Sequence, residues 1–221
     1  MGLFITFEGI EGCGKTTQIN LLAEFLSESN FPFITTREPG GSSIGKRIRG
    51  ILLDTENKEI TSKAELLLYA ADRTQHVETV ISPALKEGKT ILCDRFYDAT
   101  TAYQGKGRGL DRKLIEDLNE IASGGLKPDL TFLIDCPVEI GIERAVKRSN
   151  SESPEEMRFE KEALTFHQKV RAGYMEIAEA EQHRIVIING NRQVEKVHEE
   201  IVKIFLDKTN DNKESIKGKQ A

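Results

Sequence analysis

Residues 9–17, GIEGCGKTT, match the pattern Gly, four residues, Gly, Lys, Ser/Thr, which is typical of a loop that binds nucleotide phosphates. Glycines in such a loop let the backbone turn its N–H groups inward, toward phosphate oxygens. Lys15 is expected to reach the β- and γ-phosphates, and the hydroxyl of Thr16 is expected to bind Mg²⁺. The pattern also arises by chance in glycine-rich turns, but a strand-like run before it and a helical pattern after it favour phosphate binding.

Charged side chains stand where three other strand-like runs end: Glu38, then Asp94 with Arg95, then Asp135. Ligands of open parallel sheets bind outside the carboxyl ends of the strands, so these side chains are candidates for the same site. A carboxylate such as Asp94 beside a phosphate loop can hold Mg²⁺ through water, and Arg95 can bind a second phosphate. Taken alone, the pair Asp94-Arg95 is equally consistent with a surface ion pair or a strand cap.

Two further segments combine aromatic and hydrogen-bonding side chains. In LLLYAADR (66–73), Tyr69 and Arg73 are four residues apart and therefore share one face of a helix. A flat ring beside a forked donor suits a planar base, which stacks on the ring and accepts hydrogen bonds at its edge. DRFYDATTAYQG (94–105) adds hydroxyls, rings and an amide after Arg95. The alternative, a core tyrosine with a solvent-facing arginine, is the commoner case for one isolated pair.

Short runs rich in β-forming residues alternate with helical patterns from end to end of the chain. These runs read as strands buried on both faces of a parallel sheet, at 3–8, 31–38, 90–95, 130–135 and 184–189. Between them, apolar residues recur at helical spacing, as over 15–29. The alternation predicts a single doubly wound α/β domain over residues 1–206.

Three local features qualify this pattern. Thr61 followed by Glu65 predicts a helix start, opening a long helix that Pro83 is expected to bend. The polar segment 149–156 is expected to be a mobile loop, and 207–221, almost without apolar residues, a disordered tail.

Composition excludes several classes of protein. The chain has 221 residues with a net charge of −5, which argues against a nucleic-acid-binding surface. Its three cysteines form no CxxC pair, so we expect neither a disulfide framework nor a zinc site, and a reducing, cytoplasmic location. No apolar run approaches the ~20 residues of a membrane helix. The four histidines form no cluster typical of metal ligands, and we assign them no catalytic role.

Together these motifs resemble those of the thymidylate kinase family. FEGIEGCGKTT, TREPGG, LLLYAADR, DRFYDATTAYQG and GLKPDLTFLID occur in the family's order and spacing, over about residues 4–205. The resemblance implies the P-loop nucleoside-monophosphate-kinase fold: a five-stranded parallel sheet flanked by helices, in three α/β/α layers. It further implies a homodimer that transfers the γ-phosphoryl group of ATP to dTMP with Mg²⁺. The product, dTDP, belongs to dTTP synthesis.

The resemblance also implies roles for individual residues. The expected catalytic residues are Glu11, Lys15, Arg95 and Arg158. The expected ATP-binding residues are Gly9, Ile10, Glu11, Gly12, Cys13, Gly14, Lys15, Thr16, Thr17, Arg144 and Arg148. The expected dTMP-binding residues are Glu38, Arg49, Tyr69, Arg73, Arg95, Thr100, Tyr103 and Gln104, with Tyr103 crowding the 2′ position of the sugar. The expected metal site comprises Glu11, Thr16 and Asp94.

Three positions depart from the family's pattern, and the first is Ala99, where the family commonly has Ser. Gly12 occupies the loop position where some members carry a catalytic arginine. Other members place basic residues in a lid, here expected at about 149–158, where Met157-Arg158-Phe159-Glu160 resembles the family's Asp-Arg-x-Glu with Met for Asp. Arg158 is therefore the expected lid cation, with Arg144 and Arg148 on the preceding helix as alternatives.

Two alternative functions remain open. One is a kinase of the same fold acting on another nucleotide or on a nucleoside. A nucleoside requires a base to deprotonate its hydroxyl, whereas Arg49, Arg73 and Arg95 suit an acceptor that is already anionic. The other is a nucleotide-dependent switch, although the sequence contains no Asn-Lys-x-Asp element of the kind that reads guanine.

Overall fold

The computed structural model describes residues 2–152, 158–159 and 162–217. The sheet has five parallel strands in the order β2-β3-β1-β4-β5. Their bounds are β1 Phe4–Glu8, β2 Phe33–Arg37, β3 Thr90–Asp94, β4 Leu130–Asp135 and β5 Ile185–Asn189. Strands β3 and β2 lie on one side of β1, and β4 and β5 lie on the other. The connections that follow β1 and β3 therefore lead to opposite sides of the sheet, and this leaves a crevice at the carboxyl ends of these strands.

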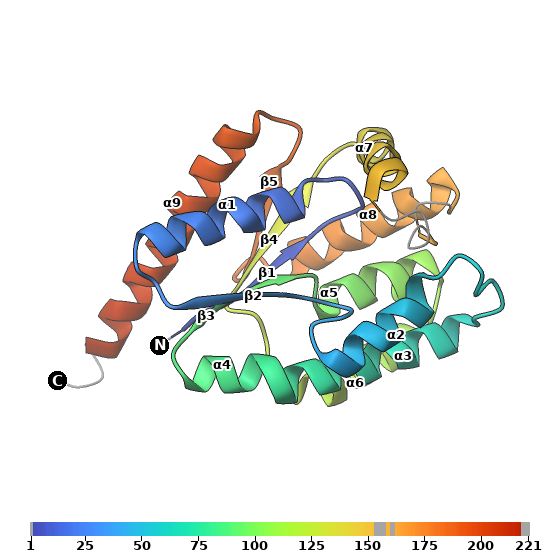
Figure 1. Ribbon diagram of the computed structural model, residues 1–221, viewed down its shortest axis with the longest axis horizontal. Helices are drawn as coiled ribbons and strands as arrows, with labels where there is room; N and C mark the ends of the chain where they lie inside the picture. The colour runs from blue at the N-terminus through green and yellow to red at the C-terminus, as the bar shows by residue number, and fades with distance from the viewer. Residues whose placement is uncertain (1, 153–157, 160–161, 218–221) are drawn as a thin grey trace.

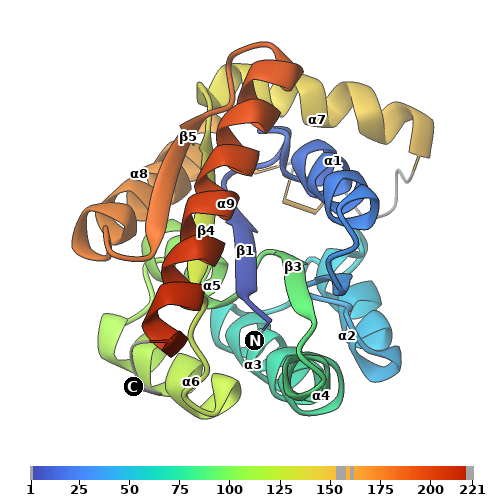
Figure 2. The same cartoon turned by 90° about the vertical axis from the view of Figure 1, so that its left-hand side faces the viewer.

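Helices cover both faces of the sheet, which gives three layers (Figure 1). Their bounds are α1 Lys15–Glu28, α2 Ser43–Leu53, α3 Ser62–His76, α4 Ser82–Lys86, α5 Tyr97–Thr100, α6 Arg112–Ser123, α7 Val138–Glu152, α8 Leu164–Ala180 and α9 Val194–Lys217, with π-helical turns η1 Val77–Ile81 and η2 Thr101–Gly107. Helix α7 lies beyond the carboxyl end of β1, on the same side as the loop that follows this strand (Figure 2).

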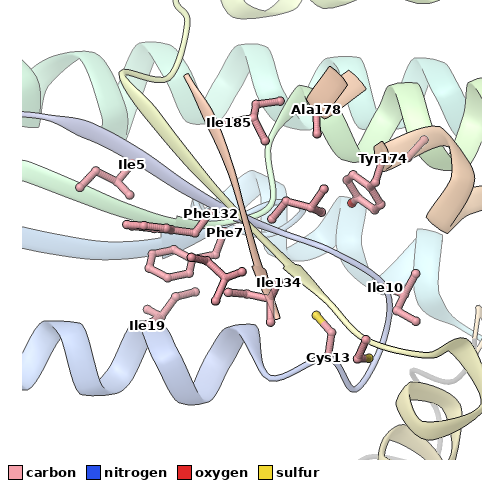
Figure 3. Close-up of a cluster of buried hydrophobic side chains, with 14 of the residues drawn as sticks. Ile5, Phe7, Ile10, Cys13, Ile19, Phe132, Ile134, Tyr174, Ala178 and Ile185 are labelled. Atoms are coloured by element: carbon pink, nitrogen blue, oxygen red, sulfur yellow. The ribbon is translucent and has the colours of Figure 1, made fainter. Parts of the chain in front are cut away.

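Alternate residues of the strands point to opposite faces of the sheet and join two clusters of buried apolar side chains. In β1, Phe7 faces α1 and packs on Phe132 of β4 with ring centroids 5.3 Å apart, above Ile19 (Figure 3). Phe4, an odd number of residues away and so on the opposite face, joins the cluster under η1 and α4 and packs edge-on against Phe96. Because β1 is packed on both faces, the position of its carboxyl end, where the phosphate loop begins, is fixed.

One long helical run links α3, η1 and α4. Thr61 caps it as the sequence predicts, because its hydroxyl accepts a hydrogen bond from the N–H of Ala64. The π-helical turn η1 ends at Ile81, two residues before Pro83, which has no N–H for the backbone hydrogen bonds of the helix. A second π-helical turn, η2, lies at the functional cavity. The close approach of α8 to η2 requires Gly173, where a Cβ would lie 3.2 Å from the Cα of Ala102.

The sequence-based expectations need three corrections. First, β2 and β5 are partly exposed because they form the sheet edges. Of the three central strands, β1 is buried throughout, and β3 and β4 are buried except at their last residues, Asp94 and Asp135. Second, α7 continues to Glu152, so the start of the predicted loop 149–156 is helical; residues 153–157 lie outside the described part of the chain. Third, α9 extends through most of the predicted disordered tail, because no glycine or proline interrupts the chain between Val194 and Lys217.

Within the described residues, no helix has the length and apolar character needed to span a bilayer.

Candidate active site

A cavity of about 790 Å³ opens at the carboxyl ends of β1, β2 and β3. This volume suits small ligands. Most predicted site residues line it: Glu11, Gly12, Cys13, Gly14, Lys15, Thr16, Thr17, Glu38, Arg49, Tyr69, Arg73, Asp94, Arg95, Thr100, Tyr103, Gln104 and Arg144. Three predicted residues whose side chains are described are not part of the lining: Gly9, Ile10 and Arg158.

The phosphate loop joins β1 to α1. Gly14 ends it with φ of 107°, a conformation that favours glycine, and α1 begins at Lys15 with its N-terminus at the cavity. The Lys15 ammonium is buried and donates hydrogen bonds to the carbonyl oxygens of Gly9 (3.0 Å) and Ile10 (2.9 Å). These two residues therefore hold the lysine at the loop, although they do not line the cavity.

Two predicted metal ligands lie together at the edge of the loop. The hydroxyl of Thr16 donates to Asp94 Oδ2 at 3.2 Å, joining the start of α1 to the end of β3. A hydroxyl and a carboxylate are hard oxygen donors, which Mg²⁺ prefers, so this pair fits the metal. The third predicted ligand, Glu11, faces Arg95 and Tyr103 instead. The described residues contain no cluster of three or more His, Cys, Asp or Glu side chains able to hold a metal ion by themselves.

Gly12 is required by the position of α7. With φ of 67°, it lies so close to this helix that a Cβ would collide with the carbonyl oxygen of Gly141. An arginine therefore does not fit at this loop position, and a cation that offsets charge on the transferring phosphoryl group has to come from elsewhere in the chain.

The opposite wall of the cavity centres on Arg95. It follows β3 with φ of 69°, a left-handed conformation that costs a non-glycine residue about 1–3 kcal/mol and is concentrated at functional sites. Its guanidinium donates to Glu11 Oε1 (3.0 Å) and to the hydroxyl of Tyr174 (3.2 Å), and it lies 4.8 Å from the ring centroid of Tyr103. The arginine is thus oriented from three elements while still lining the cavity.

Glu11 connects the phosphate loop to Arg95. Its Oε1 accepts from Arg95 and, at 2.6 Å, from the hydroxyl of Tyr103. Burial by itself would raise the pKa of Glu11, but the charge of Arg95 and the contact with His167 outweigh it and lower the pKa to about 2. Glu11 is therefore a permanent anion that holds Arg95 against the loop.

A second buried network surrounds Arg73. Its Nε donates to Glu38 (2.9 Å), while its two terminal nitrogens donate to Asn119 and Thr100, both at 2.8 Å. Glu38 also contacts Nδ1 of His76 at 3.0 Å. Three of the five donors of Arg73 are used, so two N–H groups remain for a ligand. Thr100 lines the cavity and also fixes Arg73.

Tyr69 and Arg73 both line the cavity from α3, as their spacing predicted. Gln104 reaches it from η2, and its Nε2 donates to Glu65 at 2.8 Å. Arg49 lines it from α2 and donates to the carbonyl oxygen of Pro39 at 3.1 Å.

The match to known proteins is extensive. The family model described as "Thymidylate kinase" matches residues 7–201. The chain belongs to the thymidylate kinase family. It is 55% identical to a thymidylate kinase of Geotalea daltonii over 96% of this chain and 100% of the relative. It is 56% identical to one of Pelobacter propionicus over 91% of this chain and 93% of the relative. A crystal structure of the Ehrlichia chaffeensis thymidylate kinase superimposes with a TM-score of 0.75, at 36% identity, covering 92% of this chain and 98% of that one.

Family membership, the parallel strand order and the solved relative confirm the fold that the sequence predicts. The placement of the expected lid cations is less direct. Arg158 does not line the cavity; its guanidinium binds the carboxylate of Glu65 and, at 3.3 Å, the carbonyl oxygen of Leu52. Arg144 lines the cavity from α7. The side chain of Arg148 and residues 153–157 of the expected lid lie outside the described part of the chain.

Several supporting residues were not identified as site residues from the sequence. Tyr174 donates to Glu8 Oε2 at 2.7 Å across 166 positions of sequence. His167 is fully buried on α8 with Nδ1 3.4 Å from Glu11 Oε2, and neither ring nitrogen has a hydrogen-bonding partner among the described residues. In the sequence, only the helical spacing of Phe166, Val170 and Tyr174 indicates that one face of α8 is buried.

Glu8 supplies a test of this buried network. Burial, and next the neighbouring charge of Asp98, raise the pKa of Glu8 from 4.5 to about 8. The folded state therefore retains a proton that the unfolded state loses, so this residue's contribution to stability falls as pH rises from about 4.5 to 8. Glu8→Gln lacks this loss. We expect its stability relative to wild type, from urea unfolding, to rise by up to about 1.4 kcal/mol per pH unit across that window. Parallel curves of stability against pH for wild type and Glu8→Gln would contradict the raised pKa of Glu8.

Proposed function

We propose that this protein transfers the γ-phosphoryl group of ATP to the phosphate of dTMP, giving dTDP. The observation that carries the proposal is the cavity itself. It has a phosphate loop on one wall and the half-buried, oriented Arg95 on the other, and Glu11 joins the two. The family membership of the whole described domain supports dTMP as the acceptor.

The proposed chemistry is in-line transfer through a loose transition state, in which positioning and charge neutralisation supply most of the rate. Lys15 and the loop N–H groups bind the donor phosphates, and Arg95 holds the acceptor phosphate. The acceptor oxygen is already anionic, so no general base is needed. Thr16 and Asp94 would hold Mg²⁺, which when bound neutralises charge on the donor phosphates.

The base site suits the imide edge of thymine. Arg73 offers only donors, which fits the O4 carbonyl, and Tyr69 offers a ring for stacking. Tyr103 is buried beside Arg95, so we propose that its ring excludes a ribose 2′-hydroxyl. Arg49 and Glu38 complete the wall near the acceptor phosphate and sugar.

A substrate panel tests the function. With Mg·ATP, ADP should form in step with added dTMP and more slowly with dCMP, dGMP or dAMP. A kinase for another acceptor would prefer a different nucleotide or a nucleoside. A switch would hydrolyse nucleotide slowly and regardless of dTMP.

Tyr69→Ala tests the stacking role. Stacking on an aromatic ring contributes about 1–3 kcal/mol per base, so the KM for dTMP should rise clearly. The KM for ATP should stay near the wild-type value, because Tyr69 lies on α3 and not on the phosphate loop. Equal increases in both KM values would contradict the assignment.

Arg158→Ala tests the source of the missing cation. Because Gly12 cannot be an arginine, we propose that Arg158 exchanges Glu65 for the phosphates when ATP is bound. Isolated arginines of this kind are worth roughly 10³–10⁵ in kcat, so kcat should fall by orders of magnitude with little change in either KM. A loss below tenfold would reject Arg158. If Arg144→Ala instead lowered kcat by orders of magnitude, the role would belong to Arg144, which already lines the cavity.

We also propose a homodimer. Large apolar side chains are exposed on α3 and on the two helices that it contacts, namely Leu67 on α3, Ile51 on α2 and Ile121 on α6. A second copy of the chain would cover them.

Leu67→Glu should therefore shift the protein from dimer to monomer in analytical ultracentrifugation. Leu164→Glu, at an apolar residue of similar exposure on α8, is the control and should remain dimeric. A monomeric wild type, or dissociation of both variants, would exclude this interface.

A further inference from the structure

Glu65 is a buried carboxylate that does not line the cavity but reaches it through another side chain. It lies in the first turn of α3 and is 1% exposed. Its Oε1 accepts from Gln104 Nε2 (2.8 Å) and Arg108 Nε (3.3 Å), while its Oε2 accepts from Arg158 Nη1 (2.7 Å) and Arg108 Nη2 (3.4 Å). Guanidinium groups only donate, so both oxygens of Glu65 act as acceptors.

This arrangement fixes the orientation of the Gln104 amide. A primary amide carries donors on its nitrogen and acceptors on its oxygen, and only the nitrogen can face an accepting carboxylate. The nitrogen of Gln104 is therefore held on Glu65. Gln104 lines the cavity, and its carbonyl oxygen has no donor among the described residues. The oxygen is the end of the amide that is left for a ligand.

We infer that Glu65 is a positioning residue that sets base specificity by keeping the Gln104 carbonyl turned toward the ligand. This inference rests on the proposed function. Arg73, two helical turns after Glu65, presents donors, so the cavity offers a donor and an acceptor. Thymine and uracil carry the complementary pair, the O4 acceptor and the N3–H donor. Cytosine carries an N4 donor and an N3 acceptor, and both are mismatched.

Glu65→Gln releases this constraint, because a glutamine at position 65 can accept from or donate to Gln104 and so allows the amide to turn. We expect the ratio of kcat/KM for dTMP to that for dCMP to fall at least tenfold, since sites that read hydrogen-bonding groups discriminate by 10⁴–10⁵. The value for dCMP itself should rise above wild type. Damage to the fold cannot raise kcat/KM for dCMP. Glu65→Gln could also change the position of Arg158, but this change would affect both nucleotides alike and would cancel in the ratio.

Arg108→Met is the matched control. It removes two contacts to Glu65 but leaves the Gln104–Glu65 hydrogen bond, so the ratio should stay within about twofold of wild type. If Glu65→Gln does not fold, Glu65→Asp carries the test with the same ratio. Aspartate keeps the negative charge near Arg108 and Arg158. Because its side chain is one methylene shorter, its carboxylate is withdrawn from the Gln104 amide.

An unchanged ratio, or a parallel loss with both nucleotides, would overturn the role of Glu65. That result differs from failure of the proposed function, in which the wild-type protein itself would not favour dTMP.

Discussion

The ion pair between Glu11 and Arg95 is the interaction on which the rest of the site depends. It joins a residue of the phosphate loop to a residue just beyond β3, across 3.0 Å. It therefore sets the separation between the two walls of the cavity, where we propose that the donor and acceptor phosphates bind. Transfer in line requires that separation to be held within a narrow range. The pair is mostly buried, where an unpartnered charge is costly, so each member keeps the other in place.

The surrounding elements are arranged to support this pair. Tyr103 of η2 donates to Glu11, and Tyr174 of α8 accepts from Arg95 while donating to Glu8 at the end of β1. Helix α8 can provide these contacts because Gly173 on α8 and Gly107 on η2 let the two elements approach closely. The proposed base site is a second network of the same kind, in which Glu38, Asn119 and Thr100 orient Arg73. In both networks, buried hydrogen bonds orient an arginine, Arg95 or Arg73, whose remaining N–H donors face the cavity.

The parts of this arrangement that could be predicted from sequence depend on local patterns. The strand, loop and helix around Lys15 follow from glycine spacing and periodicity, and the four-residue spacing of Tyr69 and Arg73 placed both at the cavity. The supporting contacts could not be predicted, because they join residues far apart in the chain, as Glu8 and Tyr174 do. The helix of the C-terminal tail was missed because it lacks an apolar stripe. The pairing of Arg158 with Glu65 was missed because charge alone does not identify which of several partners a side chain selects.

A double-mutant cycle on Glu11 and Arg95 tests the central claim most directly. Glu11→Gln and Arg95→Met, singly and together, would be compared in kcat/KM for dTMP, with unfolding free energies measured to confirm that each variant is folded. If the pair sets the geometry of transfer, the double variant should lose less than the sum of the single losses, with a coupling energy of at least about 1 kcal/mol. Additive losses would mean that the two residues act independently and that another contact aligns the donor and acceptor sites.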